Sequence, residues 1–523
     1  MSAPDLEGAA AVVDVANDVV AGAARLLASR GSIDDHQVLA YDLAHAAAGV
    51  ELARSVLDYG AHGDVEGRIA CAFVADAVHD LMTRVLGREH EWGVKPDGFE
   101  PVVPFLATYR DAAFLAALAG EEGPRHLDAD FELVRDTFRR FADDKVRPVA
   151  EHVHRTNGDI PEEVIAGLAE MGGFGLSVPE EYGGFASGGE SDYMGMVVAT
   201  EELSRGSLGV GGSLITRPEI LTRALVKGGT EEQKQEWLPK IASAETMVAV
   251  AVTEPDFGSD VAGIKVTATP RDEGYVINGV KTWCTFAARA DVLMLLARTD
   301  PDRSKIHRGL SLFIVPKPRG EGHGFTFKQD GGGKLEGRAI DTIGYRGMHS
   351  YEVAFEEWLV SADNLVGGEE GLGKGFYLTM EGFENGRLQT AARAVGVMQA
   401  AYEAARDYAR ERVVFGRPIG DYQLTQVKLA RMAVLIQTAR QFMYKVARLM
   451  AAGEGTLEAS MVKAYVCRAA EWVTREALQV HGGMGYAEEF PVSRYFVDAR
   501  VLSIFEGADE TLALKVIARR LTA

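Results

Sequence analysis

The sequence is poor in cysteine, with only Cys71, Cys284 and Cys467 among its 523 residues. These three lie far apart, which excludes a disulfide framework and a CxxC-type zinc site, so we expect no metal centre. Long apolar runs are missing as well, because none reaches the ~18 residues that a membrane-spanning helix requires. No basic stretch precedes an apolar one in the first residues, MSAPDLEGAA. We therefore expect a cytoplasmic protein that does not insert into a membrane.

Basic residues are in the minority: 55 Lys and Arg stand against 76 Asp and Glu, for a net charge of −21. Binding along a nucleic-acid backbone needs a basic surface, so we expect no nucleic-acid partner. The hydrophobic share of 47% and the charged share of 25% are typical of a folded globular protein. A chain of this length is expected to divide into several domains.

The spacing of apolar residues divides the chain into four segments. Residues 1–125 are Ala-rich and acidic with helical spacing, 126–247 are again helical, 248–366 carry short β-type patterns, and 367–523 return to long helices. The expected strands of one small antiparallel sheet or barrel are Val248–Val252, Lys265–Ala268, Tyr275–Lys281, Val292–Arg298, Leu310–Val315 and Tyr351–Phe355. Because helices and strands occupy separate stretches, the expected fold class is α+β.

Prolines and capping residues set the expected helix boundaries. One amphipathic helix is expected over Leu127–Glu151, ending near Pro148, and Thr230 with Gln233 predicts a capping box at the start of another. The expected C-terminal helices cover residues 375–412, 421–452, 457–481 and 509–521.

The densest polar motif is AVTEPDFGSD at Ala251–Asp260, where an expected strand runs into a proline turn and a polar loop. Main-chain N–H groups here, with the hydroxyls of Thr253 and Ser259, suit hydrogen bonds to a flavin edge or a pyrophosphate. An ordinary turn is the alternative interpretation of this motif.

A second motif is KTWCT at Lys281–Thr285. Regular alternation along a strand places Trp283 and Thr285 on the same face. An indole and a hydroxyl on one face suit stacking on a planar heterocycle and hydrogen bonding to its rim. A tryptophan in the hydrophobic core is the alternative.

Two loops with glycine follow long expected helices. In ERVVFGRPIGDYQ, at Glu411–Gln423, Arg412 suits a bidentate phosphate contact and Phe415 suits stacking on an adenine. In QVHGGMG, at Gln479–Gly485, the glycine cluster lets a ligand approach the main chain. A glycine helix cap explains this second loop as well.

An acidic residue, Glu506, stands in the apolar turn IFEG before the last expected helix. Burial among apolar neighbours raises the pKa of a carboxyl toward the value that a general base needs. Glu506 is therefore the candidate catalytic base. A surface glutamate at a helix start is the alternative.

The order and spacing of these motifs resemble the acyl-CoA dehydrogenase family over residues 127–523. The resemblance implies an N-terminal helical domain, a middle β-barrel or sheet domain and a C-terminal four-helix bundle, here preceded by an extra helical extension. It also implies FAD as cofactor, an acyl-CoA as substrate and electron-transferring flavoprotein as electron acceptor. Glu506 is the implied base, because the other base position used in the family, beside Arg387, is Gly386 here.

The resemblance further assigns binding residues. Those implied to contact FAD are Val252, Thr253, Ser259, Trp283, Thr285, Arg412, Phe415, Gln423, Gln479, Gly483 and Glu510. Those implied to contact the substrate are Ser259, Glu384, Arg387 and Gly507. The chain departs from the family pattern after the EG turn, where Ala508 and Glu510 replace a Thr and a Gln.

Three stretches resemble the subgroup that converts (2S)-methylsuccinyl-CoA to mesaconyl-CoA in the ethylmalonyl-CoA pathway. They are VLAYDLAHAAAGVELAR in the extension, EELSRGSLGVGGSLITR at Glu201–Arg217 and NGRLQTAARAVG at Asn385–Gly396. This substrate carries a free carboxylate, whose burial is costly unless it is paired. Arg217 is the candidate partner, and a surface arginine is the alternative. Other acyl-CoA specificities, an acyl-CoA oxidase or flavin monooxygenase, and a non-catalytic relative are the alternative functions.

The resemblance places the loop at Glu411–Gln423 on the FAD of a neighbouring subunit, so we expect a homo-oligomer with a dimer as its smallest unit. Many members pair two dimers through their C-terminal helices. Six residues from Gln37 to Arg54 recur at a constant offset between Gln423 and Arg440, by chance or by duplication of a helix. This echo suggests that the extension covers the same surface, which favours a dimer over a tetramer.

Overall fold

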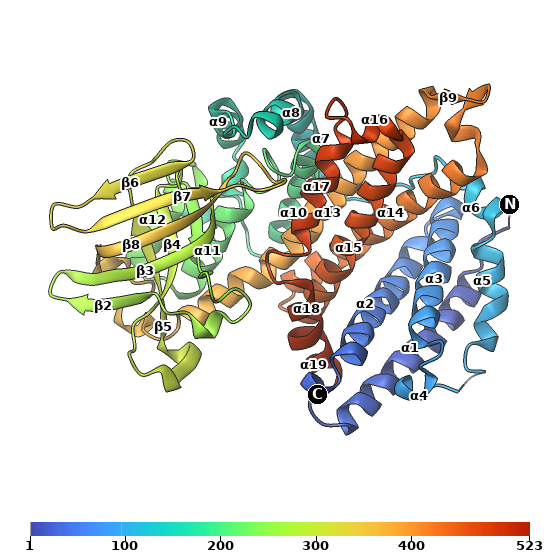
Figure 1. Cartoon of the computed structure of the whole chain (residues 1–523), viewed down its shortest axis with the longest axis horizontal. Helices are drawn as coiled ribbons and strands as arrows, with labels where there is room; N and C mark the ends of the chain where they lie inside the picture. Colours follow the sequence, from blue (N-terminus) through green and yellow to red (C-terminus); the bar gives the residue numbers. More distant parts are fainter. Residues whose placement is uncertain (1, 96) are drawn as a thin grey trace. The chain divides into compact units, whose positions relative to one another are not determined.

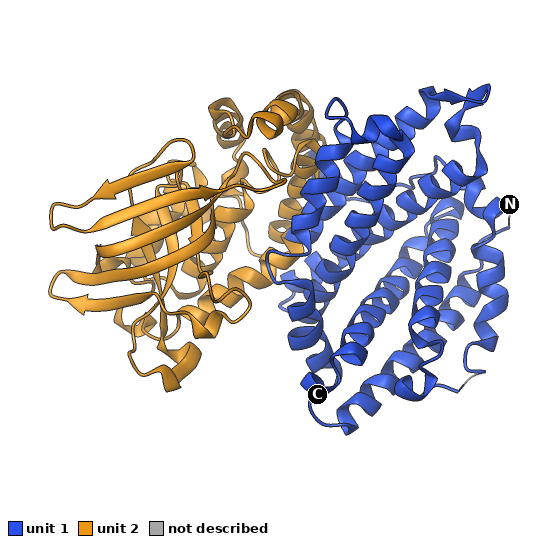
Figure 2. Ribbon diagram, viewed as in Figure 1, with its two compact units in different colours: residues 1–133, 390–523 blue, residues 134–389 orange. Residues whose placement is uncertain are grey.

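The computed structural model describes residues 2–95 and 97–523 (Figure 1). The chain forms two compact units: unit 1 contains residues 1–133 and 390–523, and unit 2 contains residues 134–389 (Figure 2). Unit 1 is built from helices and one short hairpin, whereas unit 2 combines helices with a large sheet. Within the described residues, no helix is long and apolar enough to cross a membrane.

The N-terminal extension begins unit 1 with three long helices and three short ones. They are α1 (Leu6–Ser29), α2 (Gln37–Gly60), α3 (Asp64–Val85), α4 (Glu89–Trp92), α5 (Val103–Tyr109) and α6 (Ala112–Ala117). Asp5 caps α1, because its carboxylate accepts a hydrogen bond from the N–H of Gly8 at 2.8 Å. A Cβ placed on Gly60 would lie 2.8 Å from the Cβ of Ala70. The missing side chain therefore allows α2 and α3 to approach closely.

The C-terminal helices are α13 (Gly375–Glu411), α14 (Gln423–Ala451), α15 (Thr456–His481), α16 (Gly483–Tyr486), α17 (Val492–Leu502), α18 (Asp509–Thr511) and α19 (Ala518–Leu521). The first three of the expected helices are confirmed to within two residues at each end. The expected helix 509–521 is continuous but contains a π-helical turn at Leu512–Ile517, and α17 was not predicted. Helix α2 packs against α14 and α15, and α3 packs against α14, so the extension and the C-terminal helices share one core.

Six helices precede the sheet: α7 (Ala129–Phe141), α8 (Arg147–Thr156), α9 (Glu162–Glu170), α10 (Glu190–Gly206), α11 (Thr216–Gly228) and α12 (Glu231–Ala242). The predicted helix end near Pro148 is wrong. Helix α7 continues through a π-helical turn at Ala142–Val146 into α8, which ends at Thr156. Pro148 lies inside this continuous helix and has no N–H to donate, and the wide π-helical turn before it makes room for its ring.

Two further features concern α11 and α12. Helix α11 was not predicted. The predicted capping box of α12 is confirmed: the N–H of Gln233 donates to Thr230 Oγ1 at 3.3 Å, and the N–H of Thr230 donates to Gln233 Oε1 at 3.1 Å. The side chain of Gln233 also donates to the carbonyls of Asp363 and Leu365, both at 2.7 Å, which ties α12 to the end of the sheet.

The sheet of unit 2 contains β1 (Val248–Ala251), β2 (Thr267–Arg271), β3 (Gly274–Thr285), β4 (Val292–Arg298), β5 (Leu310–Pro316), β6 (Gly324–Lys328), β7 (Lys334–Ile340) and β8 (Ser350–Ser361). The strand order is β1-β4-β2-β3-β8-β7-β6, and β5 pairs with β4. The expectation of an antiparallel sheet is wrong for two pairs, because β1 and β2 both run parallel to β4. The β6–β7 hairpin was not predicted, since glycine and charged residues interrupt its apolar pattern.

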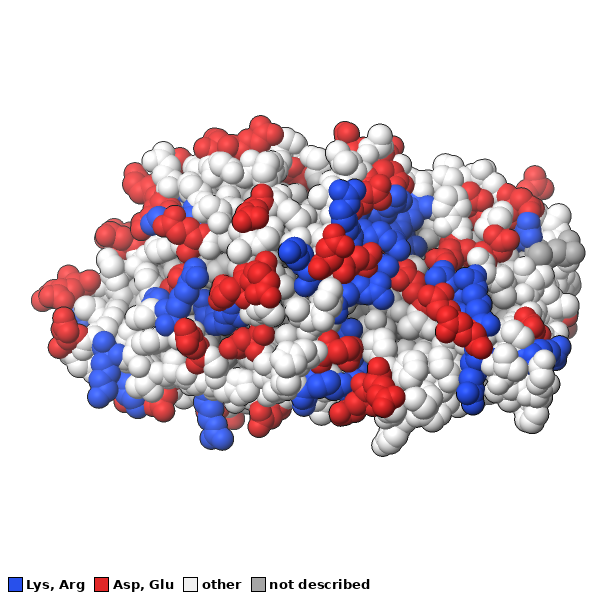
Figure 3. All heavy atoms as spheres, turned by 90° about the horizontal axis from the view of Figure 1, so that it is seen from above, with Lys and Arg blue, Asp and Glu red and all other residues white. Residues whose placement is uncertain are grey.

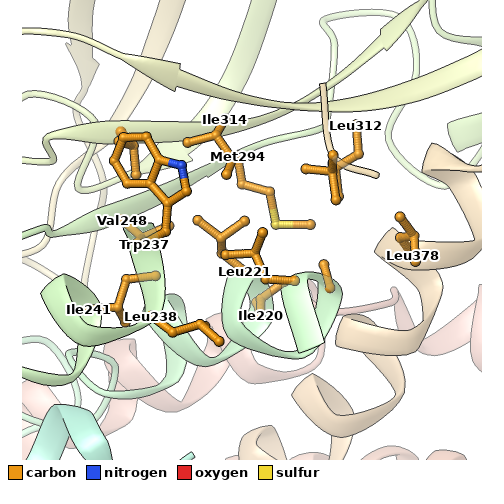
Figure 4. Close-up of a cluster of buried hydrophobic side chains, with 14 of the residues drawn as sticks. Ile220, Leu221, Trp237, Leu238, Ile241, Val248, Met294, Leu312, Ile314 and Leu378 are labelled. Carbon is orange, nitrogen blue, oxygen red and sulfur yellow. The ribbon is translucent and has the colours of Figure 1, made fainter. Parts of the chain in front are cut away.

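Buried apolar side chains fill the space between α11, α12 and the strands β1, β4 and β5 (Figure 4). The labelled members are Ile220, Leu221, Trp237, Leu238, Ile241, Val248, Met294, Leu312, Ile314 and Leu378. Full burial of one such side chain stabilises a fold by roughly 1.5–3 kcal/mol. This core fixes β1 and therefore the start of the polar loop that follows it. The α+β fold, with a helical domain on each side of a sheet domain in sequence, is confirmed.

Candidate active site

A buried ion pair holds the loop after β1. Glu254 is buried, and its carboxylate accepts hydrogen bonds from two main-chain N–H groups just before β2, at 2.7 and 2.8 Å. The ammonium of Lys281, on β3, donates to Glu254 Oε1 at 2.9 Å and to the carbonyl of Val252 at 2.8 Å. Burial lowers the pKa of Lys281 to about 8, although Glu254 opposes this shift. The pair therefore fixes the main chain next to Thr253.

The rest of this loop faces outward. Thr253 is half-buried and Ser259 is exposed, whereas Val252 is buried. A Cβ placed on Gly258 would meet only the methyl of Thr253, at 3.9 Å, so the space in front of this main chain is open. The N–H of Phe257 donates to the carbonyl of Glu254 at 3.0 Å, so part of the motif is an ordinary turn. The turn leaves Ser259 exposed and Thr253 half-buried at the surface of the loop.

Trp283 lies on β3 at a break in the strand. The register with β8 shifts between Lys281 and Cys284, and Trp283 adopts a φ of +58°. Its side chain is 54% exposed, whereas Thr285 is buried and shares a hydrogen bond with Ser350 at 3.0 Å. The expected regular alternation, with both residues alike on one face, is wrong because the bulge interrupts it. The alternative of a core tryptophan is wrong as well.

The loop between α13 and α14 is a tight hairpin of β9 (Val413–Val414) and β10 (Arg417–Pro418). Phe415 and Gly416 form its tip, with φ values of +51° and +87°, as a two-residue type I′ turn requires. A bulky residue at such a φ is strained, and strain of this kind is found preferentially at functional sites. Phe415 is 95% exposed, and Arg412 is exposed beside it. The hairpin therefore presents an aromatic ring and a cation to solvent.

The glycine cluster after α15 is both a helix cap and a stretch of open main chain, the two interpretations that the sequence offers. Gly482 caps the helix, with a φ of +60°, and its N–H donates to the carbonyl of Gln479 at 3.0 Å. A Cβ placed on Gly483 would meet nothing within 4 Å, so this main chain is open to a ligand. Gln479, and Gln423 at the start of α14, are exposed.

Glu506 lies in the turn between α17 and α18. Its side chain is only 4% exposed, and its φ is +54°. Arg393, itself buried on α13, places Nη2 4.0 Å from Glu506 Oε1 and lies 4.7 Å from the ring of Phe505. The next residue, Gly507, has a φ of +99° and accepts a hydrogen bond from the buried ammonium of Lys463 at 2.5 Å. The alternative of a surface glutamate is therefore wrong.

Three other substrate-side candidates, Arg217, Glu384 and Arg387, lie on helices of unit 2. Glu384 and Arg387 are half-buried on α13. Arg217 is buried in the first turn of α11, and its Nη2 donates to the hydroxyl of Tyr345 at 3.3 Å. The alternative of a surface arginine is wrong, because Arg217 is only 8% exposed. Glu510, by contrast, is exposed on α18.

Sequence reasoning missed three buried cations beside the predicted residues: Lys281, Arg393 and Lys463. Each interrupts an apolar stretch of a strand or helix, which is the signal that would have singled them out. A charged residue in such a position is rarely buried unless it is paired.

The face drawn in Figure 3 shows how charge is distributed. Lys and Arg gather most densely in one cluster there, and smaller groups of them alternate with Asp and Glu over the rest of that face. Among the residues visible on that face there is no continuous basic stripe of the kind that follows a nucleic-acid backbone.

Three family models match this chain. The N-terminal domain of acyl-CoA dehydrogenases matches residues 128–245, the middle domain matches 249–358 and the C-terminal domain matches 373–522. The chain belongs to the acyl-CoA dehydrogenase family. Its members are FAD-dependent oxidoreductases, and this chain is an enzyme of that type.

Individual relatives and solved structures agree with this assignment. The chain is 46% identical to (2S)-methylsuccinyl-CoA dehydrogenase of Cereibacter sphaeroides over 400 residues, which are 76% of this chain and 71% of the relative. The glutaryl-CoA complex of a glutaryl-coenzyme A dehydrogenase superposes with a TM-score of 0.69 at 30% identity, covering 76% of this chain and 96% of that one. A chain from a structure described as the electron transferring flavoprotein of Acidaminococcus fermentans superposes with a TM-score of 0.68 at 31% identity. The superposition covers 76% of this chain and 99% of that one.

Proposed function

We propose that this acyl-CoA dehydrogenase oxidises (2S)-methylsuccinyl-CoA to mesaconyl-CoA, the α,β-dehydrogenation of the ethylmalonyl-CoA pathway. The observation that carries the proposal is Glu506, a carboxylate with only 4% of its side chain exposed in a turn of left-handed main chain. The identity of 46% to an enzyme named for this substrate supports the choice of acyl group.

Glu506 acts as the base in this proposal. It takes the proton from the carbon next to the thioester, and a positioned base of this kind typically accelerates a reaction by about 10²–10⁴-fold. Negative charge then develops on the thioester oxygen, and positioned N–H groups stabilise such charge. We assign one of these donors to the main-chain N–H of Glu506, whose turn is fixed by the bond from Lys463 to Gly507.

The residues of the motifs fit FAD. Two exposed aromatic rings, Trp283 and Phe415, suit stacking on flat ring systems, and the exposed Arg412 suits a phosphate. Open main chain at Gly258 and Gly483 lets a ligand approach closely. The full set proposed to contact FAD is Val252, Thr253, Ser259, Trp283, Thr285, Arg412, Phe415, Gln423, Gln479, Gly483 and Glu510. When bound, FAD supplies the two-electron oxidant of the reaction.

The substrate side of the proposal uses residues of α11 and α13. Arg217 pairs with the distal carboxylate of the acyl group, because an arginine of 8% exposure can compensate a carboxylate taken out of water. The Tyr345 hydroxyl at 3.3 Å helps to orient its guanidinium. Glu384, Arg387, Gly507 and Ser259 are proposed to contact the rest of the acyl-CoA.

We infer a homodimer as the working assembly and electron-transferring flavoprotein as the acceptor. The exposed Phe415 at a strained hairpin tip suits a contact with the FAD of a second copy. Helix α2 packs on α14 and α15, and α3 packs on α14, so the extension covers part of the C-terminal helices, through which many members of the family pair two dimers. The likeness to a structure described under electron-transferring flavoprotein supports the acceptor.

Turnover of a panel of acyl-CoAs tests the proposal. Purified protein is first checked for a flavin absorption band and then assayed with (2S)-methylsuccinyl-CoA, butyryl-CoA and isovaleryl-CoA, with electron-transferring flavoprotein or oxygen as acceptor. We expect the highest kcat/KM for methylsuccinyl-CoA and much faster reoxidation by the flavoprotein than by air. A higher kcat/KM for an acyl-CoA with an uncharged acyl group would overturn the proposed substrate. Rapid reoxidation of the reduced flavin in air would identify an oxidase.

A further inference from the structure

The N-terminal extension contacts the segment that carries Glu506. Asp509, three residues after Glu506, accepts a hydrogen bond from the hydroxyl of Tyr41 at 2.5 Å and one from His45 Nε2 at 3.2 Å. Tyr41 and His45 are one turn apart on α2, with ring centroids 4.5 Å from each other. Figure 1 shows α2 beside α18 and α19, and α2 packs against the helical turn that follows α18.

These bonds give the turn a second fixed point. On the α15 side, Lys463 donates to the carbonyl of Gly507 at 2.5 Å. On the α2 side, Tyr41 and His45 hold Asp509, whose N–H also donates back to the carbonyl of Ser503 at 3.1 Å. Glu506, directly before these anchors, has left-handed main chain with a φ of +54°, a conformation that a residue other than glycine keeps only where the surroundings over-determine it.

The protonation states suit a charge-assisted link. Burial and the neighbouring Asp509 raise the pKa of Tyr41 to about 12, so its hydroxyl is a donor at neutral pH. Burial alone raises the pKa of Asp509, but the bonds from His45 and Tyr41 and the charge of Arg468 outweigh it, so the pKa is lowered. Burial lowers the pKa of His45. A carboxylate only accepts, so the imidazole carries its proton on Nε2. Charge-assisted bonds of this kind are about twice as strong as neutral ones.

We propose that Tyr41 and His45 are positioning residues for the catalytic base: the extension sets the place of Glu506 through Asp509. The inference rests on the proposed function, in which Glu506 removes the α proton. A displacement of about 1 Å at a reacting group can cost on the order of 10²-fold in rate. The extension would then contribute to catalysis without touching substrate or cofactor.

The test compares holoenzyme variants that remove the link with one that keeps a donor. Tyr41→Phe and His45→Leu are made singly and together, and His45→Gln keeps an N–H near the position of Nε2. Tyr109→Phe is the matched control, because its buried hydroxyl bonds to the carbonyl of Ala3 within the extension, at 2.8 Å. Bound FAD, kcat, KM and the single-turnover rate of flavin reduction by substrate are measured for each.

We expect the double variant to lower kcat and the flavin-reduction rate by about 10–100-fold with KM changed less than about twofold, since the base is misplaced but binding is not. His45→Gln should recover most of the rate lost in His45→Leu, and Tyr109→Phe should match the wild type. If the double variant does not fold, the kcat of Tyr41→Phe and the comparison of His45→Leu with His45→Gln test the inference instead. An active wild type whose variants keep its kcat overturns this inference alone, whereas a wild type that oxidises no acyl-CoA overturns the proposed function with it.

Discussion

Lys281 and Glu254 form a buried ion pair, with 2.9 Å between Nζ and Oε1, that joins the two polar motifs of unit 2. The lysine side chain is 0% exposed and the glutamate side chain 5%. Taking two charges out of water costs several kcal/mol per ion, so a pair of this kind is a weak source of stability in itself. Its loss on one side is costly, because the other charge stays buried.

We predict that Lys281→Met lowers the free energy of unfolding by about 3–5 kcal/mol, because Glu254 is left as an uncompensated buried charge. Bound FAD per chain should fall as well, since Lys281 also holds the carbonyl of Val252 next to Thr253. Thermal unfolding and flavin absorbance measure the two effects. The matched control is Lys305→Met, which breaks an exposed pair with Asp300 and should change both little. Equal effects of the two substitutions would contradict the structural role of the buried pair.

Replacing Glu506 by Gln should abolish most of the turnover while leaving FAD content and substrate binding intact. The amide is close in size to the carboxylate but accepts no proton, so kcat should fall by about 10²–10⁴-fold. Steady-state kinetics and flavin absorbance provide the measurement. Glu489→Gln, on an exposed loop of the same unit, is the control and should keep the wild-type rate. A near-normal kcat in Glu506→Gln would place the base elsewhere.

Much of the fold was predictable because its signals are local. The box of Thr230 and Gln233 marks the start of α12, and the apolar period gives α13, α14 and α15 to within two residues. Features that depend on distant contacts were not predictable. The passage of the helix through Pro148 requires the π-helical turn before it, and the parallel pairing of β1 with β4 joins segments that carry no local sign of their partner.

The site shows the same division. The sequence singles out Glu506, Trp283 and Phe415, and the structure finds each of them with left-handed main chain. The exposure of Trp283 was not predictable from alternation, because the bulge beside it arises from pairing with β8. The bond between Tyr41 and Asp509 spans 468 positions of sequence, so no motif records it.

Arg217→Met should lower kcat/KM for methylsuccinyl-CoA far more than kcat/KM for butyryl-CoA. The substitution removes the proposed partner of the distal carboxylate, and a buried charge left unpaired costs about 3–5 kcal/mol, which corresponds to roughly 10²–10⁴-fold in kcat/KM. The butyryl group has no carboxylate and should lose little. Arg223→Met is the control on the same helix, because Arg223 is bound to Glu219 at 3.1 Å and lies over the ring of Tyr193. Arg223→Met should change kcat/KM for both substrates by the same factor. Equal losses of kcat/KM for the two substrates in Arg217→Met would show that Arg217 is structural.

The mass of the full-length protein should be that of a dimer of 56.4 kDa chains. The reason is that α2 and α3 already pack on α14 and α15, so these helices offer less free surface to a second dimer. Light scattering of the FAD-loaded protein gives the mass directly. Phe415→Ala should retain this mass but release FAD more readily, if the hairpin reaches the cofactor of the partner. A tetramer would refute the covering role of the extension, and a monomer that retains FAD would refute the shared site.

Acid should weaken the link between the extension and the catalytic turn. Burial alone raises the pKa of Asp509, but the hydrogen bonds from His45 and Tyr41 and the charge of Arg468 lower it below its usual 3.8. A carboxyl with a lowered pKa in the fold stabilises that fold fully above its unfolded value, and this contribution is lost as the pH falls through the folded value.

We therefore compare two proteins that both carry His45→Gln, which removes the titration of the neighbouring imidazole. The parent keeps Asp509, and the second protein also carries Asp509→Asn, which cannot titrate. The parent should have the higher Tm near pH 6, and the difference should shrink as the pH falls below 3.8, because the bond from Tyr41 and the charge of Arg468 still favour the carboxylate of Asp509 in this background. Carboxylates elsewhere, including the nearby Glu510, act on both proteins alike, so the difference in Tm isolates Asp509. A difference that stays constant from pH 6 to pH 3 would show that the charge of Asp509 does not hold α2 to the turn.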